Sequence, residues 1–298
     1  MTYNNEIITL ELEITNKCNF KCSYCCAEAR TSNEMNYKYL ILFLKYLFKV
    51  SKNKFQIVIT GGEPLLYKNL SKLLNFLDAS KSVQNISLLT NLSKINNNFI
   101  EGLPEKLNFI LSSIHTEYYD YYLKNIGFFN KIIQTLNSKN IHVEFNVLLK
   151  NFDELNNSDF VELQKLKKIL NKLSADSKLL TFNAQFITSD DDLNNININN
   201  KIKFQKYLKI KFNSYYDKFN IDMKLFEENN FNFKGWYCKP RNYMIKFNGD
   251  IVRDCGSFPI IGHIRNLKDT QKINIRQIIC HENYCNPQIS GEIERWKK

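Results

Sequence analysis

The sequence contains no apolar run of the roughly 20 residues that a membrane-spanning helix requires. Residues 1–6 are polar and lead directly into the alternating stretch 7–14, so no cleavable signal peptide is expected. Basic runs interleaved with aromatic residues are also absent, and the lysines behind the net charge of +11 are dispersed along the chain. We therefore expect a cytoplasmic protein that does not bind membranes or nucleic acid.

Histidine is scarce and cysteine is abundant, with 4 His and 8 Cys in the chain. In a reducing compartment, thiols bind metals more often than they form disulfides. The hydrophobic fraction of 44% is enough to fill a core, and 298 residues allow one large domain and a small one. Length and composition agree with an enzyme.

Three cysteines that lie close together are the most informative feature of the chain. Cys18, Cys22 and Cys25 form a C-x3-C-x2-C pattern directly after a β-type segment, and Tyr24 precedes the third cysteine. Three such thiolates can hold three corners of an iron–sulfur cube and leave one iron open, as is usual for catalytic metal sites. Zinc or buried free thiols are the alternatives, but no histidine lies near this loop in the sequence to complete a tetrahedron. We expect Cys26 to be a small buried residue and not a ligand.

A glycine-rich turn, Thr60-Gly61-Gly62-Glu63-Pro64, follows the next apolar segment. Paired glycines at the end of a strand let backbone groups approach a ligand closely. With this turn and the cysteine loop, the sequence resembles the radical S-adenosylmethionine (SAM) superfamily. The signature of that superfamily is a C-x3-C-x-aromatic-C loop followed by a Gly-Gly-Glu-Pro turn.

Strand-like and helix-like segments alternate along the first two thirds of the chain. The sequence predicts strands over residues 7–14, 55–60, 86–90, 107–112, 142–149 and 179–187. It predicts helices over residues 34–50, 70–80, 94–101, 128–138 and 161–173, the first of them opened by Ser32 and Asn33 as candidate caps. Such alternation implies an α/β fold with parallel strands, here a partial (β/α)6 TIM-like barrel, the core fold of the family that the motifs resemble. Because the cysteine loop follows the first strand and the glycine turn follows the second, both motifs are expected at the carboxyl-terminal face of the barrel.

The resemblance implies a chemistry and a set of cofactor contacts. A [4Fe-4S] cluster on the three cysteines passes an electron to bound SAM, which gives methionine and a 5′-deoxyadenosyl radical, and a flavodoxin- or ferredoxin-type protein supplies the electron. Gly61, Gly62 and Glu63 match the turn that holds the methionine amine, and Tyr24 matches the position that approaches the adenine.

Polar residues near the ends of the later strands match further cofactor contacts of the family. Ser112 or Ser113 and Asn146 stand where family members contact the SAM carboxylate and ribose, although ordinary strand-end capping is the alternative for each. Asn91 is a weaker cofactor candidate. His115 is a candidate for substrate contact or proton transfer, with a satisfied loop histidine as the alternative.

A second group of cysteines lies near the carboxyl terminus. After a polar linker over residues 188–201 and an amphipathic helix over residues 202–219, a predicted hairpin over residues 243–253 turns at Asn-Gly. The cysteines around and beyond this hairpin are Cys238, Cys255, Cys280 and Cys285. The arrangement resembles the SPASM/Twitch domains of radical SAM enzymes, and four cysteines suit the Twitch version with a second, auxiliary [4Fe-4S] cluster. Structural zinc is the alternative.

These observations divide the chain into a barrel over residues 1–200 and a small cysteine-rich α+β, Twitch-like domain over residues 201–298. The resemblance implies a radical SAM enzyme, and we expect it to oxidise a small molecule such as a sugar or an aminocyclitol. Maturation of a ribosomal peptide by crosslinking or epimerisation is the alternative. A non-catalytic zinc-binding protein is the alternative from another class. Arg241, Arg253 and Asp254 lie beside the auxiliary cysteines, and we expect each to be a solvated surface residue. Contact with a substrate across the barrel mouth is the alternative.

Overall fold

The computed structural model of the protein describes residues 7–25, 32–149, 155–174, 179–186, 198–209, 234–253, 259–274, 277–280 and 294–296. Its main feature is a nine-stranded sheet in the order β10-β9-β8-β1-β2-β3-β4-β5-β6. Neighbouring strands from β1 to β6 are all parallel. These strands are β1 (Ile7–Glu13), β2 (Lys54–Thr60), β3 (Val83–Thr90), β4 (Leu107–Ile114), β5 (His142–Leu149) and β6 (Leu180–Phe186). The α/β fold with a partial barrel is therefore confirmed.

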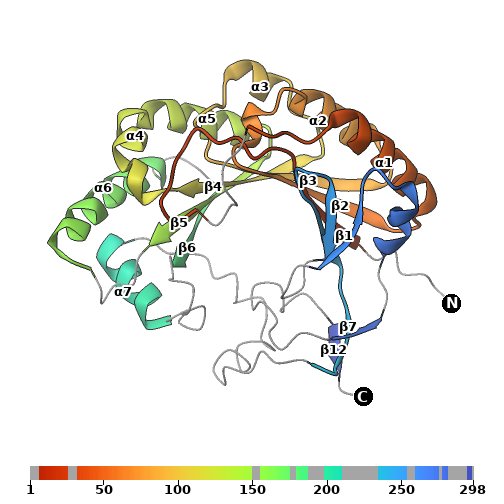
Figure 1. Cartoon of the computed structure of the whole chain (residues 1–298). Coiled ribbons are helices and arrows are strands. Elements are labelled where there is room, and N and C mark those ends of the chain that lie inside the picture. Colours follow the sequence, from red (N-terminus) through yellow and green to blue (C-terminus); the bar gives the residue numbers. More distant parts are fainter. Residues whose placement is uncertain are drawn as a thin grey trace.

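Helices cover the convex side of the arched sheet (Figure 1). They are α1 (Tyr37–Val50), α2 (Leu70–Ala79), α3 (Asn97–Glu101), α4 (Tyr119–Lys124), α5 (Ile126–Ser138) and α6 (Asn157–Ser174). Helix α1 is capped by Asn36, whose side chain accepts a hydrogen bond from the Tyr39 amide, so the expected caps Ser32 and Asn33 are wrong. The short helix α4 was not predicted, because six residues are too few to show a helical period.

The two faces of the sheet differ in polarity. Side chains that point towards the helices are fully buried, as Leu10, Ile57 and Val147 are. Their neighbours on the opposite, concave face, such as Glu11 and Gln56, are only half-buried. Strands that are covered by apolar layers on both faces are hydrophobic throughout, whereas these alternate. The concave face of the partial barrel, called the concave wall below, therefore carries many polar side chains, together with apolar ones such as Val58 and Leu111.

A hairpin from the carboxyl-terminal part of the chain extends the barrel sheet. Its strands are β8 (Asn242–Ile245) and β9 (Asp250–Arg253), and β10 (Ile260–His263) follows in antiparallel pairing. The turn contains Gly249 with φ +98°, which confirms the predicted hairpin. Strand β8 pairs in parallel with β1, so the nine-stranded sheet crosses the boundary expected at residue 200. The division into two domains stays a prediction.

The remaining described elements are small. Helix α7 (Ile198–Leu208) begins inside the stretch predicted as a linker, and residues 210–219 of the predicted helix lie outside the described residues. A three-stranded sheet consists of β11 (Ile278–Ile279), β7 (Tyr237–Lys239) and β12 (Glu294–Trp296) in that order. Three 3₁₀ turns complete the described elements used below: η1 (Pro64–Leu66), η2 (Thr116–Tyr118) and η5 (Leu267–Lys272).

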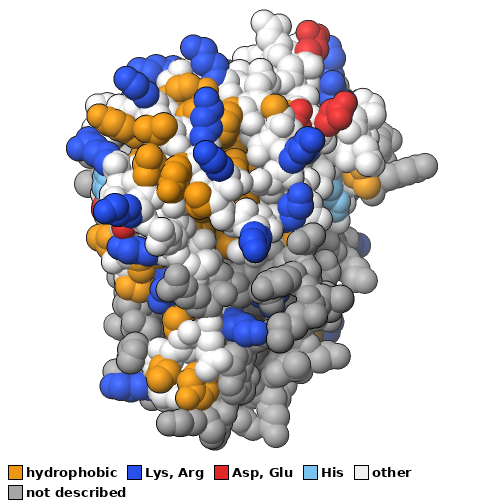
Figure 2. Space-filling view, turned by 90° about the vertical axis from the view of Figure 1, so that its right-hand side faces the viewer, with side chains coloured by type: hydrophobic (Ala, Val, Ile, Leu, Met, Phe, Trp, Pro, Cys, Tyr) orange, Lys and Arg blue, Asp and Glu red, His pale blue; other side chains and the backbone are white. Residues whose placement is uncertain are grey.

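The side of the molecule that carries α1 combines apolar and basic groups. Figure 2 shows hydrophobic side chains gathered among lysines and arginines on this side. The exposed hydrophobic residues of α1 are Tyr39, Leu42, Tyr46 and Val50. None of the helices in the described part of the chain is long and apolar enough to cross a bilayer.

Candidate functional site

The cysteine loop and the glycine turn meet at one edge of the sheet. They follow the neighbouring parallel strands β1 and β2, whose last residues, Glu13 and Thr60, are register partners. The Gly62 amide donates a hydrogen bond to the Thr15 carbonyl at 2.8 Å, and the Glu63 amide donates to the Lys17 carbonyl at 2.7 Å. The two motifs, which are 35 positions apart in the sequence from Cys25 to Thr60, are thus joined through their backbones. The predicted placement at one face of the barrel is confirmed.

Both glycines are required by this contact. Gly61 has φ +146°, and a Cβ there would lie 2.4 Å from the Thr15 carbonyl oxygen. A Cβ on Gly62 would lie 2.3 Å from the Lys17 carbonyl oxygen. The glycines therefore allow a close approach to the chain's own cysteine loop, in addition to any approach to a ligand.

Glu63 is a structural carboxylate at the centre of these loops. It is fully buried and accepts hydrogen bonds from the Thr90 hydroxyl at 2.7 Å and from the backbone amides of Asn91 at 2.8 Å and Leu65 at 3.0 Å. Burial raises the pKa of Glu63, although these hydrogen bonds act in the opposite direction. The carboxylate therefore ties the turn after β2 to the end of β3. Its contact with the methionine amine of SAM stays a prediction.

The three cysteines of the loop differ in exposure. Cys18 is half-buried, Cys22 is 9% exposed and Cys25 is exposed. Cys18 Sγ accepts a hydrogen bond from the Phe20 amide at 3.4 Å, and Asn91 Nδ2 lies 4.0 Å from the same sulfur. In the described ranges no three His, Cys, Asp or Glu side chains are grouped around one point as the ligands of a single metal ion are. Three thiols on one loop fit a cluster that binds through three of its four irons.

His115, directly after β4, lies against the cysteine loop. Its Nδ1 is 3.3 Å from Cys22 Sγ and 3.3 Å from the Tyr24 hydroxyl. The expectation that no histidine lies near this loop holds for the sequence but is wrong for the structure. His115 and Cys22 are 93 positions apart in the chain, yet the fold brings them into contact. The signal was the position of His115 after a parallel strand, since the carboxyl ends of parallel strands lie at one edge.

Tyr24 is fixed by the same segment. Its hydroxyl accepts a hydrogen bond from the Thr116 amide at 3.1 Å, and its ring lies 6.1 Å from the His115 ring at an angle of 20°. Partial burial raises the pKa of Tyr24 above its ordinary value. The phenol is therefore neutral and held in place, while contact of its ring with an adenine stays a prediction.

Two further residues of this segment hold the loop and were not identified from the sequence. The Glu117 carboxylate accepts a hydrogen bond from the Ser23 amide at 3.1 Å. The Tyr118 hydroxyl accepts one from the Lys21 amide at 2.6 Å, and its ring stacks on Phe20 with centroids 3.9 Å apart. Tyrosine and glutamate after a strand are too common to indicate such a role by themselves.

The structure separates the two candidate serines of β4. Ser112 is fully buried on the helix-facing side, and its Oγ has no hydrogen-bond partner among the described residues. Ser113 is half-buried on the concave side, where its register partner is Asn146 and the next residue in the row is Asn183. Ser113 and Asn146 therefore share the concave wall, and Ser112 does not.

Two of the four carboxyl-terminal cysteines lie within the described residues. Cys238 is 7% exposed on β7, and Cys280 packs beside it with Ile278. The Cys280 amide donates a hydrogen bond to the Trp236 carbonyl at 2.8 Å. The structure thus brings Cys238 and Cys280 together, while Cys255, Cys285 and also Cys26 lie outside the described residues.

Comparison with known proteins gives consistent matches. The model of the Radical SAM superfamily matches residues 12–166. "Molybdenum cofactor biosynthesis protein 1" from Dictyostelium discoideum is 29% identical over 178 residues, 56% of this chain and 28% of that protein. "Probable GTP 3′,8-cyclase" from Methanocaldococcus jannaschii is 32% identical over 163 residues, 50% of this chain and 51% of that protein. The chain thus spans about half or less of the length of these relatives.

A solved structure shares the architecture. The structure described as "Native anSMEcpe with bound AdoMet and Cp18Cys peptide" superposes with a TM-score of 0.57 at 17% identity. The match covers 90% of this chain and 81% of the other. At this identity the likeness concerns the fold.

Proposed function

This chain belongs to the radical SAM superfamily, and on that premise we propose that it cleaves SAM reductively and abstracts a hydrogen atom from a substrate. One observation carries the proposal: the cysteine loop and the glycine turn are hydrogen-bonded to each other at the carboxyl edge of β1 and β2. In barrels of parallel strands, the active site lies at this edge of the sheet.

In the proposed site, Cys18, Cys22 and Cys25 hold a [4Fe-4S] cluster through three irons. When bound, the cluster and SAM supply the electron and the 5′-deoxyadenosyl group. Ser113 and Asn146 offer polar contacts to SAM on the concave wall, and Tyr24 offers a neutral ring. We exclude Ser112 from this role because its side chain faces the helices.

For the substrate we propose a small polar molecule with hydroxyl or amine groups, such as a sugar or an aminocyclitol, which is oxidised. The half-buried polar residues of the concave wall support this choice, because a polyol or amine requires several hydrogen-bonding partners. A peptide substrate is the alternative, supported by the peptide named for the similar structure.

We further propose that Cys238, Cys255, Cys280 and Cys285 hold an auxiliary [4Fe-4S] cluster. The adjacent positions of Cys238 and Cys280 support this assignment. A flavodoxin- or ferredoxin-type protein would supply electrons, and the reducing cytoplasm would keep the eight thiols available. A zinc-binding, non-catalytic protein is the competing class.

Anaerobic reconstitution with iron and sulfide tests the proposal. Two clusters give about eight irons per chain, and addition of SAM and dithionite should release 5′-deoxyadenosine, measured by chromatography. Cys18→Ala, Cys22→Ala and Cys25→Ala should each lose this activity almost completely, while Cys26→Ala serves as the matched control and should keep it. Stoichiometric zinc without iron uptake would refute the proposal that the chain is a radical SAM enzyme.

A second experiment distinguishes the two substrate classes. It measures deuterium transfer into 5′-deoxyadenosine from a deuterated aminocyclitol or from a deuterated peptide.

A further inference from the structure

A cavity lies between the carboxyl-terminal hairpin and the turn η5, away from the cysteine loop. Its volume is about 290 Å³, at the low end of the range for small-molecule sites. The residues that line it are Pro240, Tyr243, Arg253, Ile261, Lys272, Asn274 and Ile278. Tyr243 of β8 is in register with Leu10 of β1, three residues before the strand ends. Since Leu10 is buried on the helix-facing side, the cavity does not open on the concave wall.

Among the described residues that line the cavity, Arg253 and Lys272 are the charged ones, and both are cationic. The charge of Lys272 is balanced, because its Nζ lies 2.8 Å from Asp269 Oδ1. Burial opposes ionisation of Asp269, but the hydrogen bonds from Lys272 and from the His263 amide outweigh it and hold the pKa of Asp269 below its usual range. Lys272 therefore already has a counter-ion within the protein.

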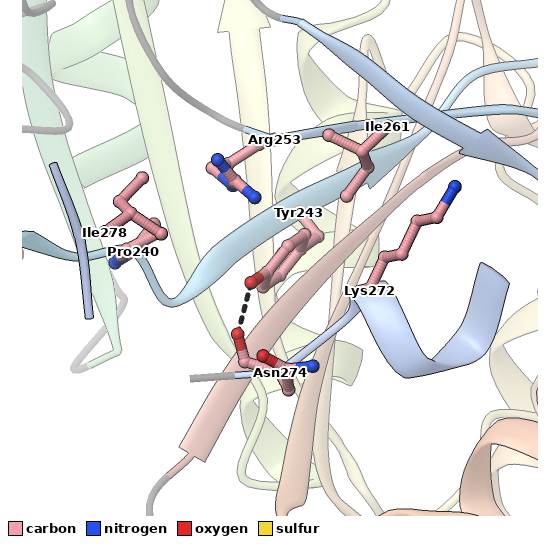
Figure 3. Close-up of a pocket in the computed structure, with 7 residues that line it drawn as sticks. All are labelled: Pro240, Tyr243, Arg253, Ile261, Lys272, Asn274 and Ile278. Carbon is pink, nitrogen blue, oxygen red and sulfur yellow. Dashed lines mark hydrogen bonds between the residues drawn. The ribbon is translucent and has the colours of Figure 1, made fainter. Parts of the chain in front are cut away.

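Arg253 has none in the described part of the chain. Its Nε is buried, and no hydrogen-bond acceptor lies within reach of it. In Figure 3 the guanidinium extends from β9 above the ring of Tyr243, between Ile261 on one side and Pro240 with Ile278 on the other. A buried donor without a partner is unfavourable, and native proteins retain few of them. An arginine whose charge is unbalanced at the wall of a cavity is the side chain that a bound anion would satisfy.

The neighbouring groups limit what kind of anion fits. The Tyr243 hydroxyl is engaged by the carbonyl of Asn274, as the dashed line in Figure 3 shows, so it is fixed in orientation. Pro240, Ile261 and Ile278 give the cavity apolar walls. A planar guanidinium binds carboxylate and phosphate groups through two parallel hydrogen bonds.

We propose that this cavity is a binding site for a small organic anion, a carboxylate or a phosphate ester with a short apolar portion, and that Arg253 is its main ligand. The site is separate from the proposed SAM site and does not depend on the proposed reaction. It also changes the interpretation of Arg253, which the sequence indicated as a solvated surface residue.

The test uses the purified full-length chain with sodium phosphate or sodium acetate as probes, at constant ionic strength. Either probe is expected to raise the temperature of thermal unfolding of the wild-type protein, because a ligand that binds only the folded state stabilises it. Stabilisation by phosphate alone identifies a phosphate ester, and stabilisation by acetate alone identifies a carboxylate. No stabilisation by either probe overturns the proposal.

Two variants separate binding from structure. Arg253→Met should weaken binding of the effective probe by about tenfold to a hundredfold, the effect of losing charge-assisted hydrogen bonds. Without a probe the same variant should unfold at the same temperature as the wild type or higher, because it removes an unsatisfied buried donor. Lys268→Met removes one positive charge from the exposed part of η5, outside the cavity, and should change affinity by less than about twofold. Equal weakening by both variants would mean a general charge effect, and destabilisation by Arg253→Met without a probe would mean a structural role; either result overturns the proposal.

Discussion

Gly62→Ala should separate the two motifs of the proposed SAM site. The new Cβ would lie 2.3 Å from the Lys17 carbonyl oxygen and 2.6 Å from its carbon, whereas ordinary contacts begin at 3.4 Å. All of the nearest atoms belong to the backbone of the cysteine loop, so no side chain can rotate away. The turn and the loop must therefore move apart by about 1 Å, which is enough to break well-aligned hydrogen bonds.

The cost follows from the contacts that this movement removes. Two hydrogen bonds are lost, from Gly62 to Thr15 and from Glu63 to Lys17, and each contributes about 1 kcal/mol net. Residual crowding adds about 1–3 kcal/mol, and the smaller entropy of the unfolded alanine chain returns up to about 1 kcal/mol. We expect the free energy of unfolding to fall by about 2–5 kcal/mol.

Urea denaturation followed by circular dichroism measures this loss, and iron content after reconstitution measures its effect on the cysteine loop. Gly127→Ala is the matched control, because a Cβ at Gly127 in helix α5 would meet nothing within 4 Å. This control should gain up to about 1 kcal/mol from helix propensity and take up iron normally. A Gly62→Ala protein with wild-type stability and full iron content would refute the contact between the two motifs.

Three further predictions concern individual side chains. Because burial raises the pKa of Glu63, the contribution of this residue to stability should fall as the pH rises above the unfolded-chain pKa of about 4.3. Urea titrations of the wild type and of Glu63→Gln measure this, and the free energy of unfolding of the wild type minus that of the variant should shrink between about pH 4 and pH 7. Growth of this difference with pH would contradict the raised pKa. His115→Phe should leave the iron content unchanged but lower the reduction potential of the reconstituted cluster by roughly 50 mV, since hydrogen bonds to cluster sulfurs help to set the potential. An unchanged potential in an EPR-monitored redox titration would exclude His115 as a hydrogen-bond donor to Cys22. Ser113→Ala should weaken SAM binding about fivefold to tenfold, whereas Ser112→Ala should leave binding unchanged and be neutral or stabilising in denaturation; equal SAM affinities for both variants would remove Ser113 from the site.

Local patterns in the sequence were sufficient to predict most of the barrel. Strand β5 begins at His142 and ends at Leu149, as the alternation of its side chains predicts. In β1 and β2, buried and half-buried residues also alternate, and the buried, helix-facing ones are apolar. These features depend on neighbours two to four residues apart, which a sequence displays directly.

The missed features depend on contacts between distant parts of the chain. Pairing of β8 with β1 joins residues more than 230 positions apart, as the register of Thr9 with Asn242 shows. Nothing in the four residues of β8 indicates which edge they occupy. The same reason explains why the position of His115 beside Cys22 was not predicted, and why Ser112 and Ser113 could not be separated before the facing of β4 was known.

The backbone of the cysteine loop is held by hydrogen bonds to other parts of the barrel. Backbone groups of Thr15, Lys17, Lys21 and Ser23 are bonded to segments that follow β2 and β4. These partners are anchored in turn by strands whose helix-facing side chains are fully buried. Within the described residues, the sheet around Cys238 consists of three short strands and a small apolar cluster of Cys238, Ile278 and Cys280. Small cysteine-rich units obtain much of their stability from the metals they bind. Removal of the two proposed clusters should therefore leave the barrel folded, and the structural effect should be confined to the carboxyl-terminal cysteines.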